Sequence, residues 1–433
     1  MSALSVPLRS ELRDVIVSDP GTRRTPQSVA DAGLRKSFLA DLTLKTVYIS
    51  APHNLRELAA LLHLPYRVAD EVFRQLRSEQ LLELTGMVDN TPCLGLTMHG
   101  RERALQLLEL CQYTGPAPVS LEDYVEQVRR QSGRQADIHC ADMQRAFAHL
   151  VLEEKMLDQL GTAVNSGAPI FLYGPPGSGK TVIATSLPRV LAGEQVWIPF
   201  AVQVENQVIA LFDPHVHDAV SSMTVEDADP RWVLCRRPAV VVGGELTADM
   251  LELQLNPLSR FYHAPAQMKA NNGVLIIDDF GRQRVRPEEL LNRWIVPLDR
   301  GVDFLTLAGG KKVEVPFEML VVFATNLEPS ELADAAFLRR MQTKIYVGGV
   351  SHKQFQQIFS RVCRDCGLRF EPTMVDQLID AIENEQHEPL RACHPRDLVN
   401  QIRSAARYRQ REPKLDASSM LTAIETYFLP DRQ

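Results

Sequence analysis

From about residue 151 to 348, short apolar runs alternate with longer amphipathic stretches, which predicts strands alternating with helices. Three of the runs are almost wholly apolar: "APIFLY", "GVLII" and "MLVVFAT". Such a run is typical of a central parallel strand, because that strand is buried on both faces of its sheet. From 349 to 433 the apolar period is helical throughout. The pattern predicts an α/β domain with a parallel sheet, followed by a helical lid.

The stretch from 35 to 115 has a different pattern. Helical spacing appears in 36–49, in "NLRELAALLH" and in "RVADEVFRQLRSEQ". Two alternating stretches then flank the turn "VDNT", and helical spacing returns in "GRERALQLLEL". Three helices, a hairpin and a helix in this order are typical of a winged helix-turn-helix-like domain.

Charge bears on what this domain contacts. Residues 31–115 hold nine Lys or Arg and ten Asp or Glu, and the whole chain has a net charge of −7. A helix that reads the DNA major groove usually carries a basic excess, since phosphate neutralisation supplies much of the affinity. Nucleic-acid binding is therefore possible but disfavoured, and a protein-docking or structural role is favoured.

The remaining segments connect these domains. Residues 1–34 mix charges, Pro and Ser and are expected to be a flexible tail, and 116–150 are expected to be a linker and a helix that leads into the α/β domain. No apolar run has the length of a signal peptide or a membrane span, so we expect no membrane insertion. The seven cysteines have no disulfide-framework spacing, which favours a cytoplasmic location.

A phosphate-binding motif follows the strand "APIFLY". The sequence "GPPGSGKT" fits G-x-x-x-x-G-K-[ST] and precedes a predicted helix, which is the context that the motif needs. Glycines let backbone N–H groups turn towards phosphates, Lys180 can reach the β- and γ-phosphates, and the Thr181 hydroxyl can ligate Mg²⁺. The candidate nucleotide-binding residues here are Gly174, Pro175, Pro176, Gly177, Ser178, Gly179, Lys180 and Thr181.

Two acids end the strand in "VLIIDDF". Asp278, at its carboxyl end, is a candidate ligand of Mg²⁺ together with Thr181, because ligands collect at this edge of open α/β sheets. Asp279 is the candidate to orient or deprotonate an attacking water. Asn326 ends the next apolar strand, where its amide can contact both the γ-phosphate and that water. These residues predict an ATP site that uses Mg²⁺.

Three arginines complete the candidate catalytic set. Arg339 and Arg340 lie in "DAAFLRRM", and Arg396 lies in "CHPRDL", at the start of a predicted lid helix. A guanidinium binds phosphate through a bidentate fork and neutralises developing charge.

With these motifs assembled, residues from about 140 to 433 resemble the AAA+ ATPases. The resemblance implies Walker motifs at 174–181 and 274–279, sensor 1 at Asn326, sensor 2 at Arg396, and an arginine finger at Arg339 or Arg340. It also implies a ring, usually a hexamer, because the finger acts on the neighbouring subunit's ATP.

Insertions give a narrower resemblance. The long 195–272 stretch and the hairpin-like "FLTLAGGKKVEVPF" look like the branch of MoxR-type chaperones and magnesium chelatase subunits. "YTGPAPVSLEDY", "IDDFGRQRV" and "NRWIVPLDR" look like bacterial predicted ATPases with chaperone activity that are associated with Flp pilus assembly. The resemblance implies a remodelling ATPase that acts on a protein partner.

Asp279 departs from the AAA+ pattern, which usually has Glu there. The shorter side chain should place its carboxylate roughly 1 to 1.5 Å further from the water, and a misplacement of about 1 Å can cost on the order of a hundredfold in rate. Two alternatives to a remodelling ATPase therefore stay open. One is a DNA-binding regulator or loader, and the other is a nucleotide-gated scaffold with weak turnover.

Overall fold

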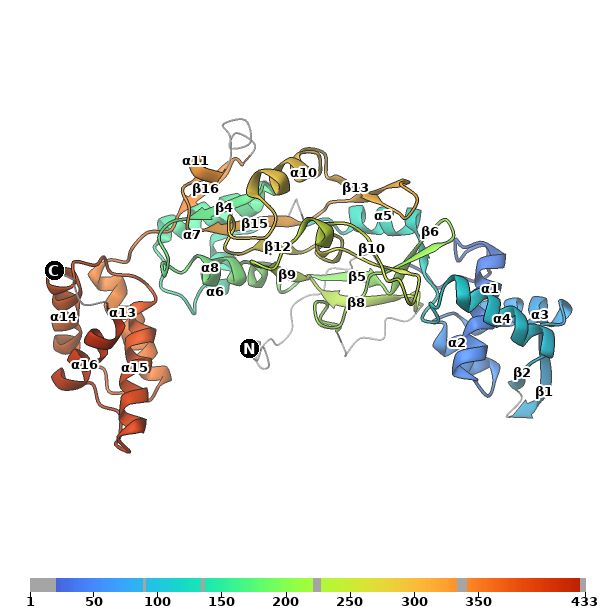
Figure 1. Ribbon diagram of the computed structural model, residues 1–433, viewed down its shortest axis with the longest axis horizontal. Coiled ribbons are helices and arrows are strands. Elements are labelled where there is room, and N and C mark those ends of the chain that lie inside the picture. The colour runs from blue at the N-terminus through green and yellow to red at the C-terminus, as the bar shows by residue number, and fades with distance from the viewer. Residues whose placement is uncertain (1–20, 89–90, 134–136, 221–226, 333–340, 429–433) are drawn as a thin grey trace. The chain divides into compact units, whose positions relative to one another are not determined.

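A computed structural model of the chain describes residues 21–88, 91–133, 137–220, 227–332 and 341–428. These residues form two compact units (Figure 1). The first contains residues up to Gln131, Leu191–Pro238 and Leu255–His263, and the second contains Ser132–Val190, Ala239–Gln254 and residues from Ala264 onwards. No helix in the described ranges is both long and apolar enough to cross a membrane.

A five-stranded parallel sheet lies at the centre of the second unit. Its order is β16-β4-β15-β12-β9, and the strands are β4 (Ile170–Tyr173), β9 (Ala239–Val242), β12 (Val274–Ile277), β15 (Leu320–Thr325) and β16 (Thr343–Tyr346). All four pairings are parallel. Every residue of β12 and β15 is buried, as the apolar runs predicted. The predicted α/β fold class is confirmed.

Strands of this sheet contact the helices α7 (Glu154–Ser166), α8 (Lys180–Ser186) and α9 (Ala266–Lys269). Trp294 of α10 (Pro287–Arg300) packs against Phe323 of β15. α6 (Cys140–Ala146) packs on α7, and α11 (Pro329–Leu332) follows β15 in the chain. Buried aromatic rings fill the space beneath the strand ends, where Phe280 lies 5.0 Å from Phe323 and 6.2 Å from Phe171 between ring centroids. This packing fixes the loop that follows β12, so the acids of that loop have a rigid support.

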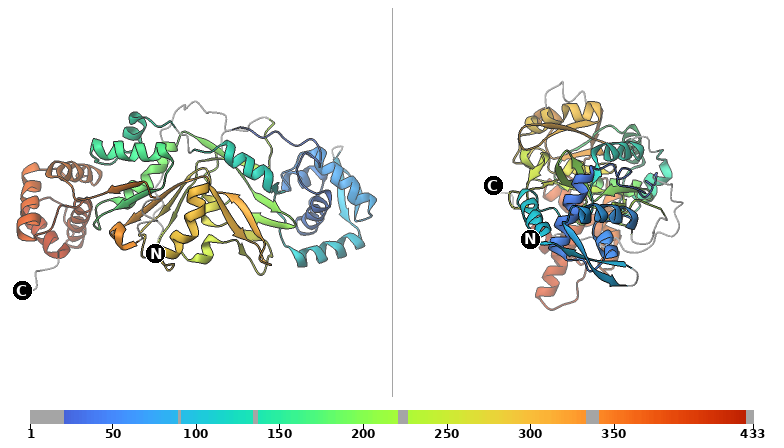
Figure 2. Two further views of the ribbon diagram at one scale, coloured as in Figure 1. Left: turned by 90° about the horizontal axis from the view of Figure 1, so that it is seen from above. Right: turned by 90° about the vertical axis from the view of Figure 1, so that its right-hand side faces the viewer.

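The lid forms a helical bundle with its own core (Figure 2). Its helices are α13 (His352–Asp365), α14 (Pro372–Asp380), α15 (His394–Tyr408) and α16 (Ala417–Tyr427). Ser351 and Gln354 form a capping box at the start of α13, and Asp416 caps α16. Phe355, Phe359 and Val375 are fully buried in the bundle. The predicted helical lid is present.

The hairpin expected in the stretch before Asn326 is also present. Strands β13 (Val302–Thr306) and β14 (Lys312–Pro316) pair antiparallel. Gly309 and Gly310 in the turn have φ values of 96° and 83°, a backbone region that favours glycine. Buried Asp303 forms an ion pair with Arg293 of α10, and this pair holds the base of the hairpin against that helix.

The first unit begins with the predicted order of helices and hairpin. It contains α1 (Lys36–Ser50), α2 (Leu55–Leu61), α3 (Tyr66–Ser78), β1 (Leu82–Val88), β2 (Thr91–Leu96) and α4 (Met98–Leu110). β1 and β2 pair antiparallel. Leu55, Leu58 and Leu62 are fully buried, so the apolar face of α2 forms part of the core. That this domain is a winged helix-turn-helix stays a prediction.

Strands from the 195–272 insertion complete the first unit. β5 (Gln195–Pro199) pairs with β8 (Trp232–Arg236). A second sheet has the order β10-β11-β7-β6-β3 and contains β3 (Val119–Ser120), β6 (Ala201–Val204), β7 (Gln207–Ala210), β10 (Gln254–Leu255) and β11 (Tyr262–His263), with α5 (Leu121–Arg130) following β3. The sequence assigned residues 151–348 to one α/β domain, whereas the structure groups Leu191–Pro238 with the N-terminal part of the chain.

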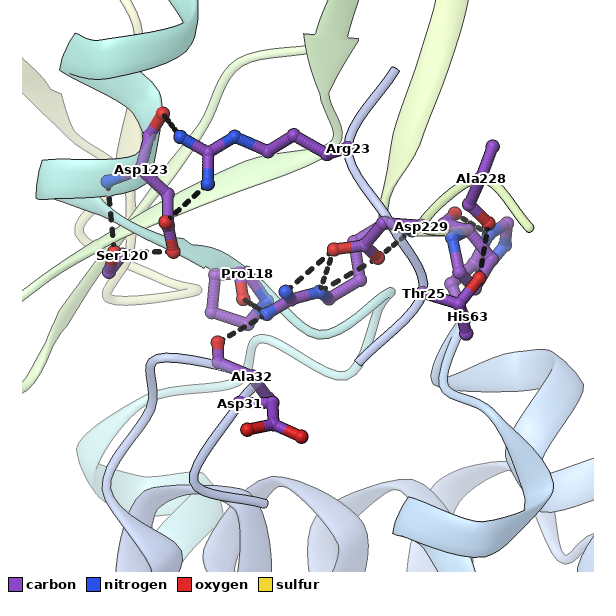
Figure 3. A network of polar contacts seen from close by, with 12 residues as sticks. Arg23, Thr25, Asp31, Ala32, His63, Pro118, Ser120, Asp123, Ala228 and Asp229 are labelled. Carbon is purple, nitrogen blue, oxygen red and sulfur yellow. Dashed lines mark hydrogen bonds and ion pairs between the residues drawn. The ribbon is translucent and has the colours of Figure 1, made fainter. Parts of the chain in front are cut away.

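A buried ion pair lies within the first unit. Arg231 and Asp229 are 2.7 Å apart, and each side chain is only 3% exposed. Arg231 also donates to the carbonyl oxygens of Ala32 at 2.7 Å and Pro118 at 3.2 Å. One guanidinium therefore joins the inserted strands, the N-terminal segment and the stretch that precedes α5 (Figure 3).

Residues 21–34 differ from the expected flexible tail. Arg23 bonds to the Asp123 carboxylate at 2.6 Å, and the Thr25 hydroxyl donates to the Ala228 carbonyl at 2.9 Å (Figure 3). These partners are 100 and 203 positions away in the sequence. No local pattern could therefore indicate that this polar stretch is anchored. Residues 1–20, the rest of the expected tail, lie outside the described ranges.

Candidate nucleotide-binding site

The phosphate-binding motif lies between β4 and α8, where the sequence predicted it. Gly174, Gly177 and Gly179 have φ values of 143°, 77° and 100°, which L side chains rarely adopt. A Cβ atom at Gly174 would lie 2.2 Å from the carbonyl oxygen of Val347. The glycines therefore fulfil a backbone requirement of the loop, and Lys180 begins the helix that follows it.

Lys180 is held against the loop. Its Nζ donates to the carbonyl oxygens of Gly174 at 2.9 Å and Pro175 at 2.8 Å, and the residue is 6% exposed. Burial lowers the pKa of Lys180, although the negative charges of Asp279 and Asp278 act in the opposite direction. The site thus holds a positive charge that has lost much of its hydration.

Thr181 and Asp278 face each other across the loop and the end of β12. The Thr181 hydroxyl donates to Oδ1 of Asp278 at 2.9 Å. The Asp278 backbone N–H bonds to Val242 O at 2.9 Å, which continues the sheet ladder up to the acid. One hydroxyl and one carboxylate are hard oxygen donors of the kind that Mg²⁺ prefers, with waters and phosphate oxygens filling its other positions. The pair therefore fits the predicted magnesium site.

Asp279 has an unusual backbone. Its φ is 50°, in the left-handed region that Asp and Asn tolerate better than most residues. Its Oδ1 accepts a bond from the Asn326 amide at 3.4 Å. Phe280, next in the chain, donates its N–H to Ala324 O and accepts a bond from the Thr325 hydroxyl. The tight turn after β12 therefore gives a physical reason for Asp in place of Glu.

A cavity of about 750 Å³ in the second unit brings the predicted residues together. Lys180, Thr181, Asp278, Asp279 and Asn326 all line it. So do Pro176, Gly177, Ser178 and Gly179 of the loop and Arg396 of the lid. The Arg396 side chain is 66% exposed, and its Nε lies 3.5 Å from a carboxylate oxygen of Asp397. Arg339 and Arg340 lie outside the described residues.

Sequence reasoning missed one wall of the cavity. This wall comes from the connecting segment, defined as residues 147–153 between α6 and α7, and from residues 346–350 after β16. A face of α13 adds Gln354, Ile358, Arg361, Val362 and Asp365. Neither "FAHLVLE" nor "YVGGV" carries a motif. The only available signal was the break in helical spacing before α7.

His149 fastens the connecting segment to the end of the phosphate-loop helix. Its Nδ1 lies 3.2 Å from a guanidinium nitrogen of Arg189, and its Nε2 lies 3.1 Å from the Ser186 hydroxyl. Because Arg can only donate, Nδ1 accepts and Nε2 carries the proton. Burial, followed by the nearby charge of Arg189, lowers the pKa of His149, so the ring stays neutral at pH 7.

The lid contacts the phosphate loop directly. The Cys393 N–H donates to Gly177 O at 3.1 Å, and a Cβ on Gly177 would lie 2.5 Å from the Cys393 sulfur. His394, the next residue, is packed against the rings of Tyr427 and Phe428, and burial lowers its pKa to about 4. This contact places the first turn of α15, and with it Arg396, at the cavity.

Comparisons with known proteins match parts of this chain. A family described as "Domain of unknown function (DUF8689)" matches residues 351–426, which are the lid. The Vesicle-fusing ATPase of Caenorhabditis elegans is 27% identical over 160 residues, which are 34% of this chain and 18% of that protein. The Vesicular-fusion protein sec18 of Schizosaccharomyces pombe is 35% identical over 80 residues, or 17% of this chain and 10% of that protein. This similarity supports an ATPase of the AAA+ type.

The matches cover limited parts of these relatives. The chain covers less than a fifth of the length of either protein. A solved structure of a RuvB variant from Thermotoga maritima is also similar, at 13% identity and a TM-score of 0.35. It covers 68% of this chain and 73% of that one. That similarity is too low to indicate an activity.

Proposed function

We propose that this AAA+-type chain is a Mg²⁺-dependent ATPase that converts ATP and water to ADP and phosphate. The observation that carries the proposal is the single cavity lined by Lys180, the Thr181–Asp278 pair, the Asp279–Asn326 pair and Arg396. These groups match the needs of phosphoryl transfer, which depends on positioning and on neutralising negative charge.

We assign binding of the ATP phosphate groups to the loop between β4 and α8 and to the carboxyl end of β12. Lys180 would exchange its bonds to loop carbonyls for bonds to phosphate oxygens, which also restores the solvation that burial removed. Thr181 and Asp278 would hold Mg²⁺, directly or through its waters. The ion supplies positive charge that offsets the charge of the phosphate oxygens.

Asp279 and Asn326 are assigned to the attacking water. The Asp279 carboxylate would accept a hydrogen bond, and then a proton, from the water, while the Asn326 amide keeps that carboxylate in place. Arg396 reaches the same cavity from α15, and its exposed guanidinium would bind the terminal phosphate. Because α15 belongs to the lid, this contact would couple hydrolysis to lid movement.

The test is steady-state phosphate release by the full chain. We expect turnover that requires Mg²⁺, stops when EDTA is added, and resumes when Mg²⁺ is restored. Arg396→Ala should lower turnover by about tenfold or more while ATP still binds. Nucleotide binding without measurable turnover in the wild-type chain would instead support the nucleotide-gated scaffold, since Asp279 is shorter than the usual Glu.

A ring is the proposed assembly. An arginine from one subunit, Arg339 or Arg340, would act on the ATP of its neighbour, in the hexamer that the AAA+ resemblance implies. Arg340→Ala subunits and Lys180→Ala subunits should each be inactive alone and should recover some activity when mixed. A mixture that stays inactive would contradict an intersubunit finger. Sedimentation with and without ATP would give the number of subunits.

The proposed partner is a protein, which a chaperone-like ATPase of the MoxR and magnesium chelatase branch would remodel in the cytoplasm. The link to Flp pilus assembly rests on the resemblance alone. Charges on α3 favour protein over DNA, because Arg74 pairs with Asp70 at 2.6 Å and Lys36 lies 3.9 Å from Glu71. A salt-sensitive shift of duplex DNA in a gel would favour the DNA-binding alternative. Capture of a protein client by Asp279→Asn under ATP would favour remodelling.

A further inference from the structure

The connecting segment (147–153) forms one wall of the cavity without a motif to explain its role. It runs from the end of α6 to Glu153, which precedes α7, and residues 149–153 line the cavity. Apolar Leu150, Val151 and Leu152 are partly buried and line the same cavity as the carboxylates. A cavity that combines apolar side chains with phosphate-binding groups suits a nucleoside triphosphate, with the base against the apolar side chains.

One lid residue holds this segment. Arg361, on α13, donates from a single guanidinium nitrogen to Ala148 O and to Leu150 O, both at 3.0 Å. Residues 147–150 form a turn in which the Leu150 N–H donates to Phe147 O at 2.8 Å. One guanidinium nitrogen carries two hydrogens, so it can donate to both carbonyl oxygens of this turn. Arg361 is partly buried and lines the cavity beside Ile358 and Val362 of its own helix.

The other side of the segment is held by the phosphate-loop helix. His149, between the two residues that Arg361 contacts, bonds to Ser186 at the end of α8. The segment is thus fastened to the lid through backbone carbonyls and to the helix through a side chain. Movement of the lid relative to α8 would therefore act on the apolar wall.

An alternative role for Arg361 is binding phosphate. Its contacts argue against this, because its guanidinium donates to two backbone carbonyls of the connecting segment. The phosphate end already has Lys180 and Arg396, and both line the same cavity. Positioning of the base therefore accounts for the Arg361 contacts better than charge neutralisation does.

We propose that Arg361 is a positioning residue that ties the lid to the base-binding wall, so that the wall is formed only when the lid is in place. The proposal rests on the proposed function, because it assumes that the cavity binds ATP. It predicts that Arg361 contributes to binding of ligands that carry a base and contributes nothing to binding of phosphate chains. Arg364 provides a matched control, since it is an exposed arginine in the last turn of the same helix.

The experiment compares the full-length wild type, Arg361→Gln and Arg364→Gln by calorimetry with Mg²⁺. The probes are ATP and inorganic tripolyphosphate. We expect Arg361→Gln to weaken ATP binding by about tenfold and tripolyphosphate binding by less than about twofold, and Arg364→Gln to change neither. The KM for ATP should rise by a similar factor in Arg361→Gln, while kcat falls by no more than about threefold.

The other outcomes distinguish failure of this inference from failure of the proposed function. ATP binding unchanged in Arg361→Gln would overturn the inference, as would an equal loss of ATP and tripolyphosphate binding. Wild-type protein that binds neither probe would contradict the proposed function itself. Arg361→Lys retains a charged donor and should recover part of the ATP affinity, and it replaces the Gln variant in the comparison should that variant not fold.

Discussion

Arg231 in the first unit and Lys180 in the second are both buried cations. Arg231 is 3% exposed and Lys180 is 6% exposed. Their surroundings differ. Arg231 is paired with a carboxylate at 2.7 Å and with two carbonyls, so its charge is neutralised where it lies. Lys180 bonds to neutral oxygens, and burial lowers its pKa. The first cation holds a fold together, and the second is poised for an anionic ligand.

Breaking the Arg231 pair should have the largest effect. Arg231→Met leaves Asp229 buried without its partner and leaves two carbonyls without a donor. We expect the free energy of unfolding to fall by about 3 to 5 kcal/mol, as for other buried pairs that lose one member. Urea unfolding measures this. The double variant Arg231→Met, Asp229→Leu should lose less, and a single variant that loses under about 1 kcal/mol would contradict the central role of the pair.

Lys180→Met should give the opposite result, a loss of activity with little loss of stability. Removing one charge-stabilising donor from a catalytic site costs about 10²- to 10³-fold in rate. Because the pKa of Lys180 is lowered on folding, its charged form opposes folding below that pKa, and the opposition fades as the pH rises towards the ordinary lysine value. Phosphate release and thermal unfolding should be measured on the same samples. A Lys180→Met variant that unfolds as readily as Arg231→Met would show that Lys180, like Arg231, mainly stabilises the fold.

Asp279→Asn should lower kcat by about a hundredfold, since it removes the group assigned to accept a proton. Asn tolerates the φ of 50° at this position, so the turn should be retained. ATP affinity, measured by calorimetry, should therefore stay within about twofold of the wild type. Unchanged kcat would remove Asp279 from the catalytic set.

Asp279→Glu should change the rate least among these variants, and the direction of that change is informative. Glu is less tolerant of the left-handed region, so we expect a loss of up to about 1 kcal/mol in urea unfolding. The longer acid should not raise kcat, because the turn at Asp279 sets where its carboxylate lies. A several-fold rise in kcat without loss of stability would show that the shorter acid merely slows the enzyme.

The sequence predicted the parts of the site that depend on local rules. The glycines of the phosphate loop, Lys180 and the acids after β12 each follow from a strand, a turn or a helix start in their own neighbourhood. The same holds for the lid helices and the hairpin around Gly309, whose periodicity and turn residues are continuous in the chain.

The parts that escaped prediction depend on distant partners. Arg361 acts on carbonyls more than 200 positions away, and a backbone carbonyl leaves no trace in a sequence. The inserted strands β5 to β8 are short, and their place in the first unit depends on contacts with residues before position 132. The left-handed backbone of Asp279 could not be predicted from the sequence either. The Asp in place of the usual Glu indicated only that this position departs from the AAA+ pattern.

The interleaved chain of the first unit also determines how this protein can be divided. Deletion of everything before residue 132 looks like removal of an N-terminal domain, but it would leave β5 to β8 behind. Those strands would lose β3 as an edge partner of β6, and Arg231 would lose the carbonyls of Ala32 and Pro118. Exposed strand edges of this kind promote aggregation. A fragment that holds only the second unit would also need Leu191–Pro238 and Leu255–His263 removed, because both stretches belong to the first unit.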